Sequence, residues 1–534
     1  MTELEDKLLH GPAASQWKVI GAKQHHGINL PLFSLRSKQS CGIGEYPDLL
    51  PLIDWCKSLG MDVIQLLPLN DGGPERSPYA ALSAFALNPL NLGLARLPHL
   101  NLMPDAAEMI EELQKLNALQ RIAYPIVQAK REAFLRHYFK TVGPLVIASP
   151  PFLDFLQKNP WLETYSLFKA LKIATQWHSW EEWPPEWRDP SPTYFQVLLD
   201  ANRDEIFYHS LLQYFCFEQL GGVQKAARQK GVFIKGDLPI LIGRESADVW
   251  HTRKYFDLEY SAGAPPDMFS YDGQNWGFPL YDWNSLEEQD YKFWKTRLQV
   301  AQQCYDIYRI DHIVGFFRIW ALSKGQSAKE GHFIPSDPSQ WIGHGEKLMR
   351  MLLANCTMLP IGEDLGTIPP AVRTSLCDLG ICGTKVIRWE RDWNRDQRFI
   401  PIQDYNPASM TTVSTHDSET LQLWWRNCPQ EARDYSAFKG WEYQEILSPE
   451  RHHEILWDSH HSSSLFHVNL LQEYLALIPD MTSPDPEDER INIPGEVSDR
   501  NWTYCFRPSL EEIISSEPLA QLIRGLLLSN KEKT

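Results

Sequence analysis

The chain has 534 residues, of which 43% are hydrophobic, and it carries a formal net charge of −17. This hydrophobic content is enough for a large core, and it excludes a globally disordered protein. Acidic and basic residues are interspersed without a long basic run, so we expect no nucleic-acid partner.

The cysteines and the first residues indicate the compartment. Nine cysteines are scattered from Cys41 to Cys505 without a C-x-x-C pair, unlike a disulfide framework or a zinc ribbon. The acidic start, residues 1–12, lacks the apolar region of a secretory signal. No stretch reaches the roughly 18 apolar residues that a membrane span needs. We therefore expect a cytoplasmic protein with no membrane partner, and no residue spacing indicates a metal site.

The chain begins with the pattern of a barrel. An amphipathic helix is predicted over 42–60, and a buried strand follows over 61–69. A long loop, 70–89, extends from the carboxyl end of that strand. From about 96 to 195 the pattern becomes helical, so we expect a helical insertion subdomain there.

From 195 to about 425 the chain returns to alternating helices and strands. Helix followed by strand, several times over, predicts right-handed βα units and a parallel sheet. The last hundred residues are less regular, with a Pro- and Asp-rich loop over 479–502 and a closing helix near 509–528. The expected fold is α/β, a single catalytic (β/α)8 TIM barrel over 1–534 with helical insertions between its strands.

Four strand-like apolar runs each end in a carboxylate, and they carry the main chemical signal. The acids are Asp237, Asp311, Glu363 and Asp417. Continuous apolar runs are typical of parallel strands that are buried on both faces, so we expect these acids on the carboxyl rim of the barrel. Several carboxylates on one rim favour the cleavage of glycosidic bonds.

Arg309 and Asp311 are two residues apart in a predicted strand, so their side chains point the same way. A guanidinium beside a carboxyl group favours its charged form, and a nucleophile that attacks an anomeric carbon must be ionised. A structural salt bridge on the rim is the alternative for this pair.

The adjacent acids Glu363 and Asp364 leave open which of them acts. A general acid needs a raised pKa, and a neighbouring negative charge raises it. In a continuing strand the two side chains point to opposite sides, so only one can face the centre of the rim. The alternative is that both stabilise the N-terminus of a helix.

His416 and Asp417 form a pair suited to vicinal sugar hydroxyls, with the imidazole donating and the carboxylate accepting. A helix N-cap is the alternative. Asp237, two residues before Pro239, has a turn as its alternative. His312 is expected to be packed or to donate to a hydroxyl group rather than to bind a metal.

Motifs along nearly the whole chain resemble those of glycoside hydrolase family 77, the 4-α-glucanotransferases or amylomaltases. They run in the family's order from about residue 25 to 425, and NIPGEVSDRNWTYCFRPSL extends the resemblance towards the C-terminus. The resemblance implies a (β/α)8 barrel. The motifs are GIGEYPDLL, LLPLN, SPYAALSAFALNP, KGDLPILIGRESADVW, GAPPDMFSYDGQNWG, YRIDHIVGFFRIW, GEDLG and STHDSETLQLWW.

The resemblance also implies roles for individual residues. Asp311 matches the family's nucleophile, Glu363 its acid/base, and Asp417 the third acid, which holds hydroxyls and distorts the sugar. No catalytic position departs from the family's pattern. The positions that match sugar-binding residues are Tyr79, Asp237, Trp276, Arg309 and His416.

The loop 263–277 matches one that covers the acceptor side. Its aromatic residues, among them Phe269 and Tyr271, are expected to keep water from the site. Two sequence differences lie near the substrate groove. The family often has Gly-Asn-Pro where this chain has Leu-Asn-Pro at 87–89, and a polar residue where this chain has Ala80.

The resemblance implies a retaining enzyme that transfers a segment of an α-1,4-glucan to the 4-hydroxyl of an acceptor through a covalent glycosyl-Asp311. The implied substrates are maltooligosaccharides or glycogen-derived α-1,4-glucans, and no cofactor is implied. A glucan hydrolase of the same clan shares all the carboxylates and is one alternative. A non-catalytic glycan-binding protein is another, and the intact set of acids speaks against it.

Overall fold

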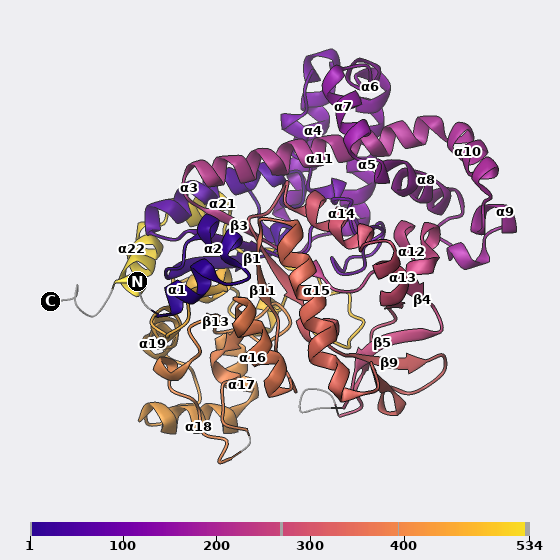
Figure 1. The fold of residues 1–534 in the computed structure, drawn as a ribbon. Coiled ribbons are helices and arrows are strands. Elements are labelled where there is room, and N and C mark those ends of the chain that lie inside the picture. The colour runs from indigo at the N-terminus through magenta and orange to yellow at the C-terminus, as the bar shows by residue number, and fades with distance from the viewer. Residues whose placement is uncertain (1–2, 267–270, 394, 529–534) are drawn as a thin grey trace.

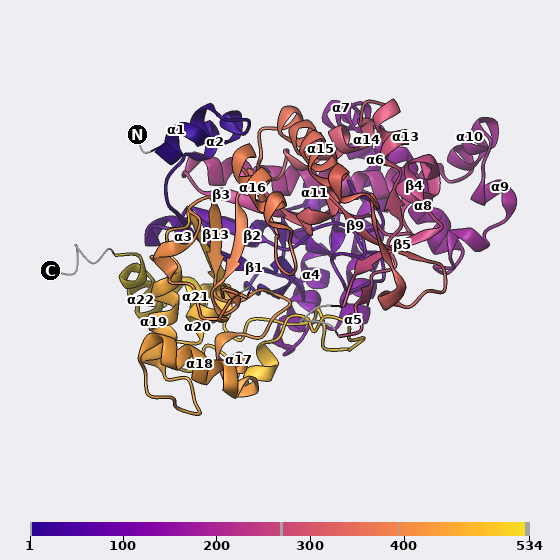
Figure 2. The same ribbon diagram turned by 60° about the horizontal axis from the view of Figure 1, so that its bottom comes forward.

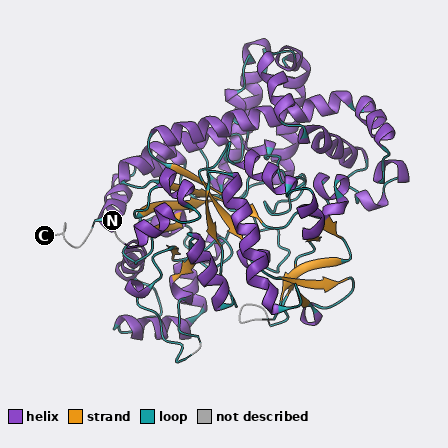
Figure 3. Cartoon of the chain, viewed as in Figure 1, coloured by secondary structure: helices purple, strands orange, loops and turns teal. Residues whose placement is uncertain are grey.

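A computed structural model describes residues 3–266, 271–393 and 395–528. Its centre is a parallel barrel, orange in Figure 3, with helices around it. The strands follow one another around the barrel in chain order, which confirms the expected (β/α)8 fold. They are β1 (His25–Leu30), β2 (Val63–Leu66), β3 (Phe233–Pro239), β8 (Ile307–Asp311), β11 (Leu359–Gly362), β12 (Gly383–Val386), β13 (Ser409–Thr412) and β14 (Phe466–Leu470).

The barrel closes between β11 and β12. Ile361 and Cys382 form a parallel bridge, and the N–H of Gly362 donates to the carbonyl of Cys382 over 2.8 Å. On the opposite side, β14 pairs with both β1 and β13. The sequence patterns did not single out β14, because His467 and Asn469 interrupt its apolar run although both are buried. With β11 joined to β12, each strand of the barrel has a neighbour on both sides.

Helices cover the outside of the barrel, and both described ends of the chain lie on one side of the molecule (Figures 1 and 2). The indole of Trp17 donates to the carbonyl of Gly380, which joins α2 to the end of α16. Between β12 and β13, the described residues form two short 3-10 helices and an isolated antiparallel bridge between Arg391 and Phe399, without an α-helix. The outer helices are α1 (Glu3–His10), α2 (Ala14–Ile20), α3 (Leu49–Leu59), α12 (Ala247–His251), α13 (Trp283–Glu288), α14 (Lys292–Ala301), α15 (Trp341–Asn355), α16 (Pro370–Leu379), α17 (Leu421–Asn427), α18 (Pro429–Lys439), α19 (Pro449–His460), α20 (Leu471–Leu475), α21 (Leu510–Ser515) and α22 (Glu517–Leu527).

A group of helices separates β2 from β3 and lies at the top of Figure 1. We propose that these insertion helices are the helical insertion expected from the sequence, extended to Gln229. In the described part of the chain, no helix has both the length and the apolar character to cross a membrane. The insertion helices are α4 (Ala106–Gln114), α5 (Tyr124–Thr141), α6 (Gly143–Ile147), α7 (Pro150–Lys158), α8 (Trp161–Ala174), α9 (Pro185–Arg188), α10 (Pro192–Ala201) and α11 (Arg203–Gln229).

A small antiparallel sheet, lower right in Figure 1, is built from segments that follow β3 and β8. Its strand order is β10-β9-β5-β6. A separate antiparallel pair, β4 with β7, lies in the segment between β3 and β8. The sheet carries the end of the loop 263–277. Its strands are β4 (Phe256–Asp257), β5 (Tyr260–Ala264), β6 (Gln274–Asn275), β7 (Leu280–Tyr281), β9 (Ile319–Ser323) and β10 (His332–Ile334).

Candidate active site

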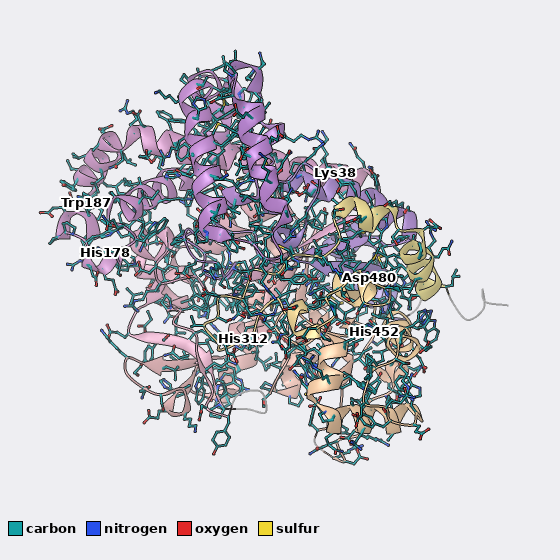
Figure 4. All side chains as sticks on the ribbon, turned by 180° about the vertical axis from the view of Figure 1, so that it is seen from behind. Lys38, His178, Trp187, His312, His452 and Asp480 are labelled. Carbon is teal, nitrogen blue, oxygen red and sulfur yellow. The ribbon has the colours of Figure 1, made fainter. Side chains whose placement is uncertain are left out.

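The four acids indicated by the sequence lie at or just beyond the carboxyl ends of barrel strands. Asp237 is inside β3, Asp311 ends β8, Glu363 follows β11, and Asp417 follows β13. The turn considered for Asp237 is not observed, because Asp237 lies in a strand. The N-cap considered for Asp417 is not observed either, because the N-cap of α17 is Thr420. In Figure 4, His312, which follows Asp311, lies well inside the outline of the molecule.

Arg309 joins two of these carboxylates. Its Nη1 lies 2.8 Å from Asp237 Oδ2, and its Nη2 lies 2.7 Å from Asp311 Oδ1. The Asp237 side chain is fully buried, whereas 29% of the Asp311 side chain is exposed. The guanidinium therefore orients Asp311 while leaving part of its carboxylate accessible, and the sequence foresaw only the second of these two pairs.

Glu363 is held beside Asp311 by backbone donors. The N–H of His312 donates to its Oε2, and the N–H of Leu365 to its Oε1, both over 2.9 Å. His312 has a left-handed backbone with φ of 50°, which residues with a side chain rarely adopt. Burial raises the pKa of Glu363 to about 7; Arg309 and the two N–H groups oppose this rise, and Asp311 adds to it.

Asp364 turns away from Glu363. Its Oδ1 accepts from the N–H of Thr384 over 2.7 Å, and its Oδ2 lies 3.1 Å from Arg373 Nε. Gly383 makes room for it, because a Cβ at that position would lie 2.6 Å from Asp364 Oδ1. Asp364 is thus a buried structural carboxylate, and Glu363 is the acid that shares the rim with Asp311.

Tyr79 links the remaining acids. Its hydroxyl donates to Asp237 Oδ2 over 3.0 Å and lies 3.0 Å from His416 Nε2. The same His416 nitrogen lies 3.1 Å from Asp417 Oδ2. Burial alone raises the pKa of Asp417, but His416 and the amide of Asn492 outweigh it and hold this pKa at about 2. Asp417 is therefore ionised at neutral pH.

Trp276 approaches the same rim from the small sheet. Its ring meets that of His312 edge-on, with centroids 4.8 Å apart. Burial lowers the pKa of His312 to about 4, so its imidazole is neutral at pH 7. In the same loop the Tyr271 side chain is 85% exposed. Phe269 lies outside the described residues.

A C-terminal segment that sequence reasoning missed completes the site. Asn492 Nδ2 donates to Asp417 Oδ1 over 2.7 Å, and Arg490 Nη2 donates to the Asp417 carbonyl over 3.2 Å. The Trp502 ring packs near those of Tyr79 and His416. The loop has no periodic pattern, and only the NIPGEVSDRNW motif marked it.

The arrangement brings an oriented carboxylate, an acid with a pKa near neutrality and several further polar side chains to one rim. Such a rim on a (β/α)8 barrel is typical of enzymes that act on glycosidic bonds. In the described part of the chain, no three His, Cys, Asp or Glu side chains are placed to hold a metal ion.

A family model described as 4-alpha-glucanotransferase matches residues 30–510, and the chain belongs to this family. It is 46% identical to a 4-alpha-glucanotransferase of Chlamydia pneumoniae, over 94% of this chain and 95% of the relative. It is 30% identical to that of Thermus thermophilus, over 85% and 89%. The fold matches an amylomaltase from Streptococcus agalactiae in complex with acarbose, with a TM-score of 0.81 and 24% identity, over 94% of this chain and 98% of that one. The family expected from the motifs is confirmed.

Proposed function

We propose that this 4-alpha-glucanotransferase transfers a segment of an α-1,4-glucan to the 4-hydroxyl of an acceptor with retention of configuration. The observation that carries the proposal is the pairing of two different carboxyl groups at one rim. Asp311 is bound by Arg309, and Glu363 has a pKa of about 7. A nucleophile and a general acid need these two environments.

In the first step, the Asp311 carboxylate attacks the anomeric carbon of the donor. The bond from that carbon to the glycosidic oxygen breaks, and Glu363 gives its proton to the leaving oxygen. The product is a covalent glycosyl-Asp311, and the released fragment carries the former reducing end. Glu363 is then ionised beside Arg309, which stabilises its charge.

In the second step, the acceptor's 4-hydroxyl attacks the same carbon. Glu363 takes the hydroxyl proton, the ester bond to Asp311 breaks, and the new α-1,4 bond forms. Both residues return to their initial states, so the proton balance closes within the pair. Two displacements on one carbon give retention.

The other polar groups at the rim bind the donor sugar. The ionised Asp417 accepts hydrogen bonds from sugar hydroxyls, while His416 and Tyr79 are placed to donate or accept. Asp237 holds Arg309 through Nη1, whereas Asp311 pairs with Nη2. Trp276, in contact with His312, offers an aromatic face for a sugar ring.

For transfer to dominate, the acceptor hydroxyl must react with the glycosyl-Asp311 faster than water does. A positioned hydroxyl gains a large effective molarity over bulk water. The loop 263–277 enters the rim through Trp276 and carries the exposed Tyr271, so it is suited to hold the acceptor. We assign it this covering role.

Incubation with maltotriose, followed by chromatographic separation of the products, tests the proposal. Transfer predicts glucose together with maltopentaose and longer oligomers. Glucose and maltose without longer products would identify the hydrolase of the same clan. Binding of maltotriose without any product would identify a glycan-binding protein.

A further inference from the structure

The loop 70–88, here called the Tyr79 loop, begins at a buried carboxylate that the proposed reaction does not use. Asp71 Oδ2 accepts from the hydroxyl of Tyr165 and from Lys169 Nζ, each over 2.5 Å. Its Oδ1 accepts from the N–H of Gly73 over 3.0 Å. Tyr165 and Lys169 lie one helical turn apart on α8, so an insertion helix supplies both donors.

The backbone of Asp71 also joins the two ends of the Tyr79 loop, here called its neck. The Asp71 N–H donates to the Ala86 carbonyl over 3.0 Å, and the Leu82 N–H donates to the Asp71 carbonyl over 2.7 Å. At the other end, Gln213 on α11 binds both backbone groups of Leu87, each over 2.8 Å. Helices α8 and α11 pack against each other, as Figure 1 shows along the insertion. Both ends of the loop are therefore fixed to one rigid pair of helices.

Between these fixed ends, the loop reaches the acidic centre described above through hydrogen bonds of Tyr79. Its hydroxyl contacts Asp237, His416 and Arg309 at 3.0, 3.0 and 3.5 Å. A hydrogen bond weakens steeply with displacement, so the hydroxyl must be held to within a fraction of an ångström. The backbone between residues 71 and 82 is turns and bends, without a helix or strand to fix it.

We propose that Asp71, Tyr165 and Lys169 are positioning residues that set the place of the Tyr79 hydroxyl at the active site. The inference rests on the proposed function for what Tyr79 does there. It gives the insertion helices a part in the reaction, because α8 supplies both partners of Asp71. None of the three side chains touches the acids of the rim.

The chemistry of the cluster supports a positioning role. Asp71 and Tyr165 are buried, and only 12% of the Lys169 side chain is exposed. Removing one partner of a buried ion pair leaves an uncompensated charge, which the loop relieves by moving Asp71 towards water. Such a movement displaces the neck of the loop and withdraws the Tyr79 hydroxyl.

A double-mutant cycle separates positioning from general stability. The single variants are Lys169→Met and Tyr79→Phe, and the measured quantity is kcat/KM for maltotriose disproportionation. Lys169→Met is expected to lower it roughly tenfold in the wild-type background, within the coupling range of residues in one network. In the Tyr79→Phe background the same change is expected to have little effect, since the hydroxyl is already absent.

The matched control is Arg131→Met. Arg131 on α5 forms another buried ion pair, 2.8 Å from Glu45 in the segment between β1 and α3. Its other hydrogen bonds go to Cys41 and Leu92, outside the Tyr79 loop. Its effect on kcat/KM should multiply independently with that of Tyr79→Phe. This control loses a comparable interaction without touching the loop.

Two outcomes would overturn the proposal: an unchanged kcat/KM in Lys169→Met, or a loss of equal size in both Tyr79 backgrounds. If Lys169→Met does not fold, Tyr165→Phe replaces it in the cycle, because it removes one donor and keeps the ring. Absence of transfer by the wild-type protein would contradict the proposed function instead. In that case the measured quantity of the double-mutant cycle becomes the affinity for maltohexaose, determined by calorimetry. An unchanged affinity in Lys169→Met, or an equal loss in both Tyr79 backgrounds, would again overturn the proposal.

Discussion

Asn492 donates a hydrogen bond to the carboxylate of Asp417 over 2.7 Å, although the two residues are 75 positions apart in the chain. A hydrogen bond to a charged group contributes about 1.5–3 kcal/mol. Asn492→Ala should therefore lower kcat/KM for maltotriose by roughly ten- to a hundredfold. Asn492→Asp should be more harmful, because it places a like charge against Asp417.

The control for this prediction is Asn501→Ala. Asn501 binds Ile493 and Glu496 of the same segment but does not contact Asp417. A loss of the same size in Asn501→Ala would show that loop order, rather than the bond to Asp417, determines the rate.

Glu363→Gln and Asp364→Asn should fail in different ways. Glu363→Gln removes the general acid, so transfer from maltotriose should fall by roughly 10²–10⁴. A glucosyl fluoride donor, whose leaving group needs little protonation, should still glycosylate the enzyme, and azide should speed turnover. Asp364→Asn breaks the pairing with Arg373 and should lower the melting temperature with a smaller effect on kcat. Azide rescue of Asp364→Asn alone would reverse these assignments.

The pH profile of kcat/KM should report Glu363. The first step needs its protonated form, and burial raises its pKa to about 7. Activity is therefore present below about pH 7 and lost as the pH rises through it, with a slope of one proton. In the Glu363→Gln variant, measured with a glucosyl fluoride, this alkaline limb should disappear. An identical limb in both proteins would assign it to another group.

The sequence was most informative where function and strand pattern coincide. Asp237, Asp311, Glu363 and Asp417 follow apolar runs, so their common rim could be predicted from the parallel barrel alone. Contacts made by tertiary packing gave no local signal. Arg490 and Asn492 lie in an irregular loop, and Asp71 meets Lys169 across 98 positions. The strand β14 was not predicted because His467 and Asn469 make its sequence polar, although both side chains are buried.

Tyr271→Ala tests the loop 263–277. If the loop holds the acceptor and excludes water, its loss should raise the ratio of hydrolysis to transfer on maltotriose. Phe438→Ala serves as the control, because Phe438 is an exposed aromatic residue on α18, outside the loop. A lower rate with an unchanged ratio would remove this role from Tyr271.

The covalent glycosyl-Asp311 is the central claim, and trapping it is the most direct measurement. Glu363→Gln cannot activate an acceptor, so with maltosyl fluoride the Asp311 carboxylate should displace fluoride and the ester should accumulate. Proteolysis and mass spectrometry should then find one maltosyl group on the peptide that contains Asp311, and none in the Asp311→Asn variant. A maltosyl group on Asp237 or Asp417, or fluoride release without any labelled peptide, would contradict the account.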